Sequence, residues 1–188
     1  MTDPAASPVL FSVGHGARSL EAFLDLLRGA GIERLVDVRT APGSRKHPHF
    51  GKDALAASLA EAGIEYRWER ALGGWRRPKP DSRHVALRSG GFRGYADHME
   101  TEEFVSAVGL IAEGRERRTA FMCSESLWWR CHRRLLSDAL TIRGCRVMHL
   151  MEGGRQEPHF LSPMARVEGS ALVYDLDEGI QELFPQSP

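Results

Sequence analysis

The sequence predicts a three-layer α/β fold, in which helices cover both faces of a mainly parallel sheet of about five strands. Short apolar runs alternate along the chain with amphipathic segments of helical period, and this alternation is typical of strand–helix–strand units. Glycines follow the helical segments at Gly31, Gly63 and Gly144, where helices commonly end. The 188 residues are 42% apolar, which favours a single α/β domain over residues 1–188 with its own core.

The elements follow from these signals in chain order. A strand at 9–13 leads to a helix after Ser19, a residue type that caps helix N-termini. Two buried strands at 32–38 and 64–68 enclose a second helix near 55–62, and the stretch 71–91, with four Gly and two Pro, has no period and reads as a long loop. The remaining predictions are helices at 92–99, 101–112 and 126–140, strands at 119–122 and 145–150, and an additional strand at 171–174.

The topology indicates where a functional site would lie. In a parallel sheet the loops that follow the strands emerge at one edge, and ligands bind there. These loops comprise residues 14–16, 39–50, 69 onward and 123–125. They carry most of the chemically reactive side chains of the chain, so the sequence predicts a site at the C-terminal edge of the sheet.

Charge is distributed unevenly, although 25 Lys and Arg balance 25 Asp and Glu. The basic excursion 67–93 has 8 basic and 2 acidic residues, whereas the acidic C-terminal tail 151–188 has 2 basic and 7 acidic residues. Aromatic rings among basic side chains suit stacked bases and phosphates. The candidate nucleic-acid-binding residues of the excursion are Trp75, Arg76, Arg77, Arg93 and Tyr95. An ordinary solvated basic loop, or a lid over the site, explains the same composition.

Several short motifs follow one another along the chain. They are Val13-Gly14-His15-Gly16, Asp37-Val38-Arg39, Pro42-x-Ser44-Arg45, Phe50, Leu72-Gly73-Gly74, Tyr95-Ala96-x-x-Met99, Cys123-x-Glu125 and Cys131-His132-Arg133. The set resembles the bacterial and archaeal family called domain of unknown function 488, over a family-like core at 11–149. Gly16 stands where that family commonly has serine. The resemblance supports the fold and the place of the site, and it implies no particular reaction.

Cys123 is the first candidate for the chemistry. It ends a strand a few residues before a predicted helix, where unpaired N–H groups lower the pKa of a thiol. A thiolate there would suit sulfur transfer or phosphate ester hydrolysis. The alternative is a small buried residue that closes a core strand, since cysteine is among the most buried residue types.

A metal site is conceivable but is not what the spacing predicts. Cys131 falls on the apolar stripe of the predicted helix at 126–140, which favours core packing. Cys123, Cys131, His132 and a further histidine would supply four ligands, but Cys-x7-Cys-His matches no familiar zinc pattern. The sequence therefore predicts neither a metal nor a cofactor.

A second group of residues suits an anion such as phosphate or carboxylate. Arginine binds both through a planar fork, and glycines let backbone N–H groups approach a ligand closely. The candidates are Arg39, Ser44, Arg45, Arg130 and Arg133, with Gly14 and Gly16. Arg130 and Arg133 are three residues apart and would share one helix face. The alternative is that these arginines pair with Asp37, Glu125 and other acids.

His15 and Asp37 end or nearly end predicted neighbouring strands, so a carboxylate–imidazole pair that orients a general base is one interpretation. In the other, Asp37 accepts hydrogen bonds from the backbone of the 14–18 turn. Glu125, if desolvated beside Trp128 or Trp129, would be an acid or base with a raised pKa.

The leading hypothesis is a small enzyme, a hydrolase or transferase, that acts on a phosphate-bearing ligand such as a nucleotide or nucleic acid. Two alternatives remain open: a non-catalytic nucleic-acid-binding module that uses residues 67–93, and a thiol enzyme built on Cys123. Three cysteines and no signal-like apolar stretch predict a cytoplasmic protein. No run approaches the roughly 20 apolar residues that span a bilayer, so no membrane partner is predicted.

Overall fold

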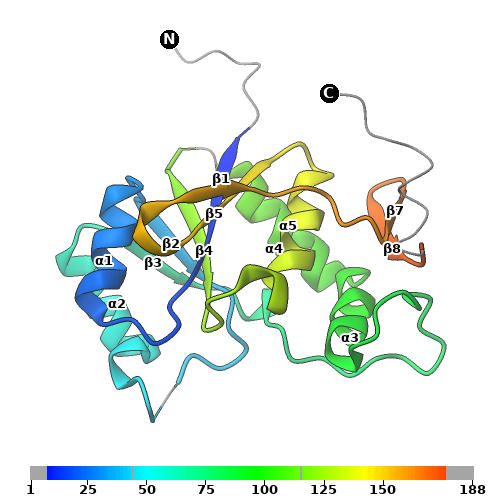
Figure 1. The fold of residues 1–188 in the computed structure, drawn as a ribbon, viewed down its shortest axis with the longest axis horizontal. Coiled ribbons are helices and arrows are strands. Elements are labelled where there is room, and N and C mark those ends of the chain that lie inside the picture. Colours follow the sequence, from blue (N-terminus) through cyan, green and yellow to red (C-terminus); the bar gives the residue numbers. More distant parts are fainter. Residues whose placement is uncertain (1–7, 44, 115, 177–188) are drawn as a thin grey trace.

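The computed structural model describes residues 8–43, 45–114 and 116–176, and it confirms the α/β class. Ser44 and the end of the acidic tail, residues 177–188, lie outside the described residues. The main sheet has six strands in the order β3-β2-β4-β1-β5-β6, and Figure 1 labels β1 to β5 of this sheet. Its strands are β1 (Val9–Gly14), β2 (Arg34–Asp37), β3 (Glu65–Trp68), β4 (Thr119–Cys123), β5 (Arg146–Leu150) and β6 (Gln156–Pro158). The first five are parallel, and β6 runs antiparallel to β5.

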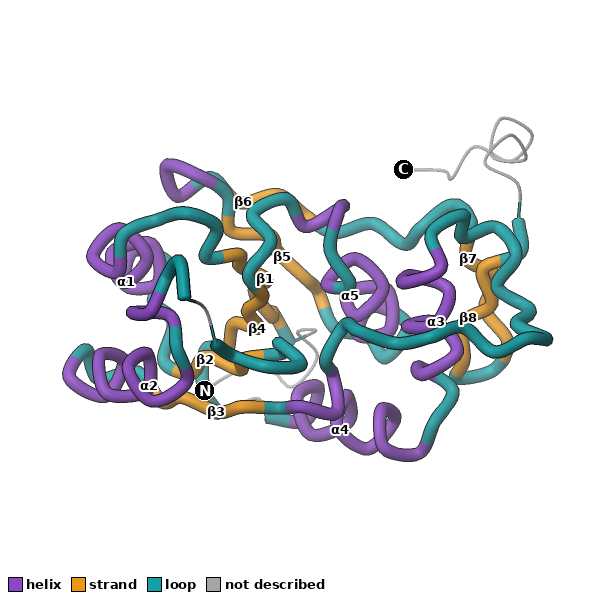
Figure 2. The backbone as a smooth tube through the Cα atoms, turned by 90° about the horizontal axis from the view of Figure 1, so that it is seen from below, coloured by secondary structure: helices purple, strands orange, loops and turns teal. Residues whose placement is uncertain are grey.

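Five helices cover the two faces of this sheet, as Figure 2 shows. They are α1 (Leu20–Gly29), α2 (Lys52–Glu61), α3 (Gly90–Met99), α4 (Glu102–Glu113) and α5 (Arg133–Thr141). Helices α1 and α2 pack on one face and α4 and α5 on the other, whereas α3 packs against α4, α5 and the C-terminal hairpin. Each face of the sheet has its own hydrophobic core, and successive residues of a strand point to opposite faces. Leu35 of β2 packs in the core under α1 and α2, and Val36 packs in the core under α4 and α5. Burial on both faces explains why the central strands β1 and β4 read as continuous apolar runs, whereas the edge strand β3 alternates between exposed and half-buried residues.

The predicted ends of the first helices are confirmed. The Ser19 hydroxyl accepts a hydrogen bond from the Ala22 N–H at 3.2 Å and so caps α1. Gly31 and Gly63 follow α1 and α2 with φ of 66° and 73°, a left-handed conformation that side chains with a Cβ rarely adopt. Short 3-10 turns lie at Pro48–Phe50, Arg70–Leu72, Trp128–Arg130 and Glu152–Gly154.

The predicted helix at 126–140 is wrong over its first turns. The chain makes the 3-10 turn at Trp128–Arg130, becomes extended at Cys131 (φ −121°, ψ 154°), and enters α5 only at Arg133. Arg130 and Arg133 therefore do not share one helix face. The four-residue spacing that suggested one continuous helix arises because both segments are amphipathic, and the turn between them redirects Cys131.

Three strands in the C-terminal part differ from prediction, and two of them, at 156–158 and 165–168, were not predicted. The strand predicted at 171–174 exists as β8 (Ala171–Tyr174), but it pairs with β7 (Ala165–Glu168) in a separate hairpin beside α3 (Figure 1). The edge strand β6 was not predicted, because Gln156–Pro158 carries no apolar signal. Within the described residues, no helix has the length and apolar character needed to cross a membrane.

The strand order decides what meets at the C-terminal edge. Strand β4 lies between β1 and β2, so Cys123 pairs in register with Gly14, and Met122 pairs with Asp37. The loops that follow these three strands are therefore neighbours. The edge predicted from sequence is where the candidate site is found.

Candidate functional site

A cavity of about 880 Å³ opens at this edge. Its walls come from the loops after β1, β2, β3 and β4 and from the start of α3. The predicted site residues that line it are His15, Gly16, Arg39, Trp75, Arg76, Cys123, Glu125 and Arg130. Residues that the sequence analysis did not assign to the anion site, among them Thr40, Gly74, Phe92, Cys131 and His132, complete the lining.

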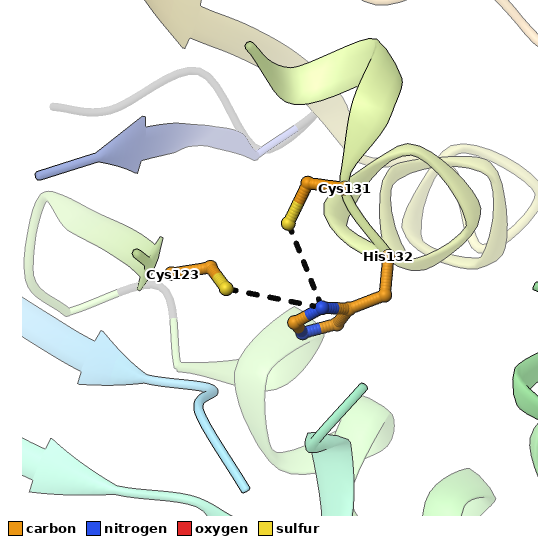
Figure 3. Close-up of side chains that lie close together, drawn as sticks. All are labelled: Cys123, Cys131 and His132. Atoms are coloured by element: carbon orange, nitrogen blue, oxygen red, sulfur yellow. Dashed lines mark hydrogen bonds between the residues drawn. The ribbon is translucent and has the colours of Figure 1, made fainter. Parts of the chain in front are cut away.

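Two cysteines and a histidine meet at one end of the cavity (Figure 3). The Nδ1 atom of His132 lies 3.5 Å from Sγ of Cys131 and 3.9 Å from Sγ of Cys123. All three ligand-type atoms lie within 4.8 Å of one another, and all three residues are buried. Cys131 is thus buried as predicted, but its side chain faces the site and not only the core. We call these three residues the Cys–Cys–His cluster.

The orientation of the His132 ring is fixed by a backbone contact. Its Nε2 atom lies 3.1 Å from the carbonyl oxygen of Val38, which can only accept a hydrogen bond. Nε2 therefore carries the proton, and in the neutral ring Nδ1 presents a lone pair to both sulfur atoms. Gly74 packs against the same ring, since a Cβ at that position would lie 2.3 Å from Nδ1.

The two thiols differ in acidity, in the opposite sense to the prediction for Cys123. A hydrogen bond from the Cys123 thiol to Cys131, together with burial, raises the pKa of Cys123 to about 12. The same hydrogen bond lowers the pKa of Cys131 to about 6, aided by the Arg133 guanidinium, whose Nε lies 3.5 Å from its sulfur. The expectation of an acidic Cys123 is wrong, because the negative charge of the pair is better stabilised at Cys131.

Asp37 forms a buried ion pair with Arg39 and not with His15. Its carboxylate accepts hydrogen bonds from Nε and a terminal nitrogen of Arg39 at 2.9 and 2.6 Å, and from the Tyr66 hydroxyl at 2.8 Å. The Asp37 side chain is fully buried. Both interpretations of Asp37 from sequence are therefore wrong: neither the imidazole nor the 14–18 turn is its partner, and the carboxylate instead holds Arg39 in place.

His15 is a neutral residue of the cavity wall. Its Nδ1 donates to the carbonyl oxygen of Gly16 at 2.9 Å, its Nε2 lies 3.5 Å from Arg39, and its ring stacks on Phe50. Burial, together with the adjacent Arg39, lowers the pKa of His15 to about 4. His15 therefore offers an unprotonated nitrogen near neutral pH, but it is a weak base.

Arg133 is buried and satisfied by the protein itself. It is 1% exposed and donates to Ser12 Oγ at 3.2 Å and to the backbone carbonyl oxygens of Glu125 and Ser126. The guanidinium thus fastens the loop after β4 to the sheet. Its predicted role in holding an external anion is not supported by this geometry.

The two glycines of the first motif serve the packing of the same loop. A Cβ on Gly14 would lie 1.9 Å from the carbonyl oxygen of Glu125, and one on Gly16 would lie 2.1 Å from Ser126 Oγ. The N–H of Gly16 donates to Ser124 O at 3.0 Å. These close approaches explain the glycines without a ligand, and they leave the Gly16 N–H engaged.

Arg130 and Arg45 remain of the anion-site candidates, and Glu125 remains of the candidates for the chemistry. Arg130 is exposed and lines the cavity. Arg45 is exposed, and it is not among the described residues that line the cavity. Glu125 lines the cavity but is exposed and accepts a hydrogen bond from the Leu127 N–H at 3.1 Å. The predicted desolvation of Glu125 beside the tryptophans is therefore wrong.

The predicted nucleic-acid-binding residues of the basic excursion differ in burial and in position relative to the cavity. Trp75 is 88% exposed and lines the cavity together with Arg76. Tyr95 is fully buried in the core and donates to Leu72 O, and Arg93 donates to Leu87 O. Burial removes Tyr95 from any nucleic-acid surface, whereas Arg93 is half-buried and is not part of the described cavity lining. Arg77 is exposed but is not part of the described cavity lining.

A second polar cluster, not anticipated from sequence, lies beneath the α5 side of the sheet. Nε2 of His149 meets Nδ1 of His159 at 3.0 Å, and Nε2 of His159 meets Asp138 at 3.0 Å. Tyr174 donates to the same carboxylate. Burial lowers the pKa of His149 to about 3, and its ring stacks on Trp128 at 4.0 Å. Residues so far apart in the chain gave no sequence signal of this contact.

A comparison with family models gives one match, to the model described as Domain of unknown function DUF488, over residues 19–140. The chain belongs to the DUF488 family. The match covers most of the core predicted at 11–149 but begins after the Val13-Gly14-His15-Gly16 motif. No curated protein and no solved structure matches this DUF488 chain, and the family description assigns no reaction.

Proposed function

We propose that the chain is a small enzyme, a hydrolase or transferase, that binds a phosphate-bearing ligand such as a nucleotide in the cavity at the C-terminal edge of the sheet. The observation that carries this proposal is the charge of the lining. Among the described residues, the lining contains three arginines and one residue with a carboxylate. The arginines are Arg39, Arg76 and Arg130, and the carboxylate is that of Glu125. Because Asp37 neutralises Arg39, the excess positive charge comes from Arg76 and Arg130.

Two further features favour a nucleotide over a simple anion. The cavity volume of about 880 Å³ lies within the roughly 300–1,000 Å³ of small-molecule sites. The indole of Trp75, which is 88% exposed, offers a flat apolar surface next to Arg76, and bases stack on such rings. A nucleotide would place its phosphates on the arginines and its base on Trp75.

The chemistry would take place near the Cys–Cys–His cluster. Cys123, Glu125 and His15 line the cavity and are the candidate reactive groups. Asp37 is a positioning residue, because it reaches the cavity only through Arg39. The elevated pKa of Cys123 counts against the alternative of a thiol enzyme in which Cys123 is an acidic nucleophile. A reducing cytoplasm would keep both thiols of the cluster available.

The alternative of a non-catalytic nucleic-acid module rests on residues 67–93. It loses Tyr95 as a contact, because that ring is buried in the core, and the half-buried Arg93 donates to Leu87 O. It keeps Arg77, which is exposed beside the cavity-lining Arg76. These adjacent arginines therefore form a matched pair of test positions.

The test measures binding of adenosine diphosphate by calorimetry and by quenching of tryptophan fluorescence. We expect Arg76→Gln to weaken binding about tenfold, because a hydrogen bond between charged groups contributes about 1.5–3 kcal/mol, and Arg77→Gln to change it less than about twofold. Rising salt should weaken binding further. The nucleic-acid-binding module would be favoured if both substitutions weakened the binding of a single-stranded oligonucleotide equally and neither changed the binding of the diphosphate.

Catalysis is tested separately by product analysis after incubation with the diphosphate. Because Cys123 is a candidate reactive group but not an acidic nucleophile, we expect Cys123→Ser to keep the binding constant and to slow, without abolishing, the release of phosphate and AMP. Absence of binding to the diphosphate and to inorganic phosphate, in a protein that melts cooperatively, would overturn the proposed function.

A further inference from the structure

The Cys–Cys–His cluster has the spacing of a metal coordination shell. In tetrahedral coordination, with Zn–S of about 2.3 Å and Zn–N of about 2.0 Å, a sulfur and a nitrogen ligand lie about 3.6 Å apart and two sulfurs about 3.8 Å apart. Nδ1 of His132 lies 3.5 and 3.9 Å from the two sulfurs, and all three atoms lie within 4.8 Å of one another. Only small side-chain adjustments would be needed to surround an ion.

The His132 ring is already arranged as a metal ligand. A ligating histidine usually donates its other ring N–H to a carbonyl or carboxylate, which fixes the tautomer and the orientation of the ring. The Nε2–H of His132 donates to Val38 O at 3.1 Å, so the Nδ1 lone pair points at Cys123 and Cys131 (Figure 3). Close contact with Gly74 restricts the ring further.

The ligand types select the ion. Two sulfurs and one imidazole nitrogen form a soft donor set, which suits zinc and disfavours magnesium or calcium. Three protein ligands leave one tetrahedral position for water or substrate, as in catalytic rather than structural zinc sites. Cys123, Cys131 and His132 all line the cavity, so that position faces the space where a ligand would bind.

We propose that Cys123, Cys131 and His132 bind one zinc-class divalent ion, with its fourth coordination position open to the cavity. On binding, two Zn–S bonds and one Zn–N bond form, and the protons still held by the thiols pass to the solvent. The two thiolates balance the charge of the ion, and Arg133 beside Cys131 helps to stabilise the negative sulfur. This site goes beyond the proposed phosphate chemistry and does not depend on it.

The experiment measures zinc in tag-free protein purified under reducing conditions without chelator, followed by zinc titration against a chromogenic chelator. We expect about one equivalent in the wild type, and affinity lower by at least about a hundredfold in Cys123→Ser, Cys131→Ser and His132→Gln. Glutamine keeps an N–H donor near the position of Nε2 and removes Nδ1. Cys145→Ser is the matched control, because Cys145 is buried outside the cluster, and it should bind zinc like the wild type.

A second pair of variants leaves all ligands in place. A Cβ at Gly74 would lie 2.3 Å from Nδ1 of His132, whereas one at Gly43, also in the cavity wall, would meet nothing within 4 Å. Gly74→Ala should therefore weaken zinc binding about tenfold, and Gly43→Ala should not change it. Cobalt substitution supplies an independent signature, thiolate-to-metal absorption that is lost in Cys131→Ser.

Several results would overturn the metal site. One is a wild type that binds zinc no more tightly than Cys131→Ser, with both proteins folded by circular dichroism. Another is reduced protein that takes up no zinc while mild oxidation joins Cys123 to Cys131 in a disulfide, which would make the pair a redox couple. Zinc binding without diphosphate binding would remove only the proposed function, and the reverse result would remove only the metal.

Discussion

The buried pair of Asp37 and Arg39 allows a quantitative test of whether Asp37 is structural. The substitution Asp37→Asn keeps the shape of the side chain and removes its charge. In the wild type the carboxylate accepts three hydrogen bonds from Arg39, at 3.1 Å from its N–H and at 2.9 and 2.6 Å from its guanidinium, and one from Tyr66. The Asp37 side chain is fully buried and that of Arg39 is 7% exposed, so the loss of charge leaves a buried cation without its counter-charge.

The expected magnitude follows from this geometry. Removal of one partner of a buried ion pair costs about 3–5 kcal/mol, which should lower the melting temperature of a chain of this size by on the order of 10 °C. Tyr66→Phe removes one hydrogen bond to the same carboxylate and should cost about 1 kcal/mol. The double substitution Asp37→Leu with Arg39→Met should recover much of the loss, because no buried charge remains.

The assay is urea denaturation followed by circular dichroism, with thermal melting as a second measure. Asp25→Asn is the control, because the Asp25–Arg28 pair is 3.4 Å long with both side chains more than half exposed. Such surface pairs contribute about 0–1 kcal/mol. If Asp37→Asn were destabilised by no more than Asp25→Asn, the buried pair would not stabilise the fold and our reasoning about Asp37 would be refuted.

Two further predictions concern stability. Burial and the neighbouring His159 hold the pKa of His149 near 3, compared with about 6.5 in the unfolded chain. The stabilisation from the neutral His149 is therefore complete above pH 6.5 and is lost as pH falls toward 3, which lowers the free energy of unfolding by about 4–5 kcal/mol. His149→Phe should flatten this part of the stability profile, measured by urea denaturation at several pH values. Gly16 has φ of 56°, and a Cβ there would lie 2.1 Å from Ser126 Oγ, so Gly16→Ala should lower the free energy of unfolding by about 1–3 kcal/mol. A Cβ at Gly29 would meet nothing within 4 Å, so the control Gly29→Ala should be neutral or stabilising. Equal melting temperatures of the two variants would contradict the packing argument.

The fold was predictable because its signals are local. Strands buried on both faces are apolar over their whole length, and capping residues such as Ser19 mark helix starts within a few positions. The place of the cavity followed from topology, because parallel strands deliver their loops to one edge. Contacts among side chains of different loops have no such local signature, and the errors concentrate there.

Cys131 illustrates the limit. Its four-residue spacing from Leu127 and Leu135 is that of a helical stripe, and no proline or glycine marks a break between them. The backbone is extended at Cys131, and the Cys131 sulfur lies within 4.8 Å of the Cys123 sulfur at the end of β4. Tertiary contacts of this kind have no local signature, so the spacing correctly predicted a core position for Cys131 but could not predict that Cys131 also lines the cavity.

Tyr95 and Arg93 illustrate the same limit in the basic excursion. Their residue types suit nucleic acid, but burial decides what an aromatic or basic side chain can touch. The Tyr95 ring fills the core and its hydroxyl finds a backbone acceptor at Leu72 O, as buried tyrosines generally do. Composition could identify the segment that reaches the cavity, but it could not say which of its side chains point inward.

The glycines connect these observations into one account of how the cluster is held. A Cβ on Gly14 would meet Glu125 O, one on Gly16 would meet Ser126, and one on Gly74 would meet His132. All three contacts fall on residues 125–132, the segment that carries Cys131 and His132. The end of β1 and the loops after β1 and β3 therefore pack against this segment. Cys123 is held at the end of β4, which pairs with β1 and β2. Three side chains from two parts of the chain are thus held together by backbone packing, so that an ion would bind without first having to order its ligands.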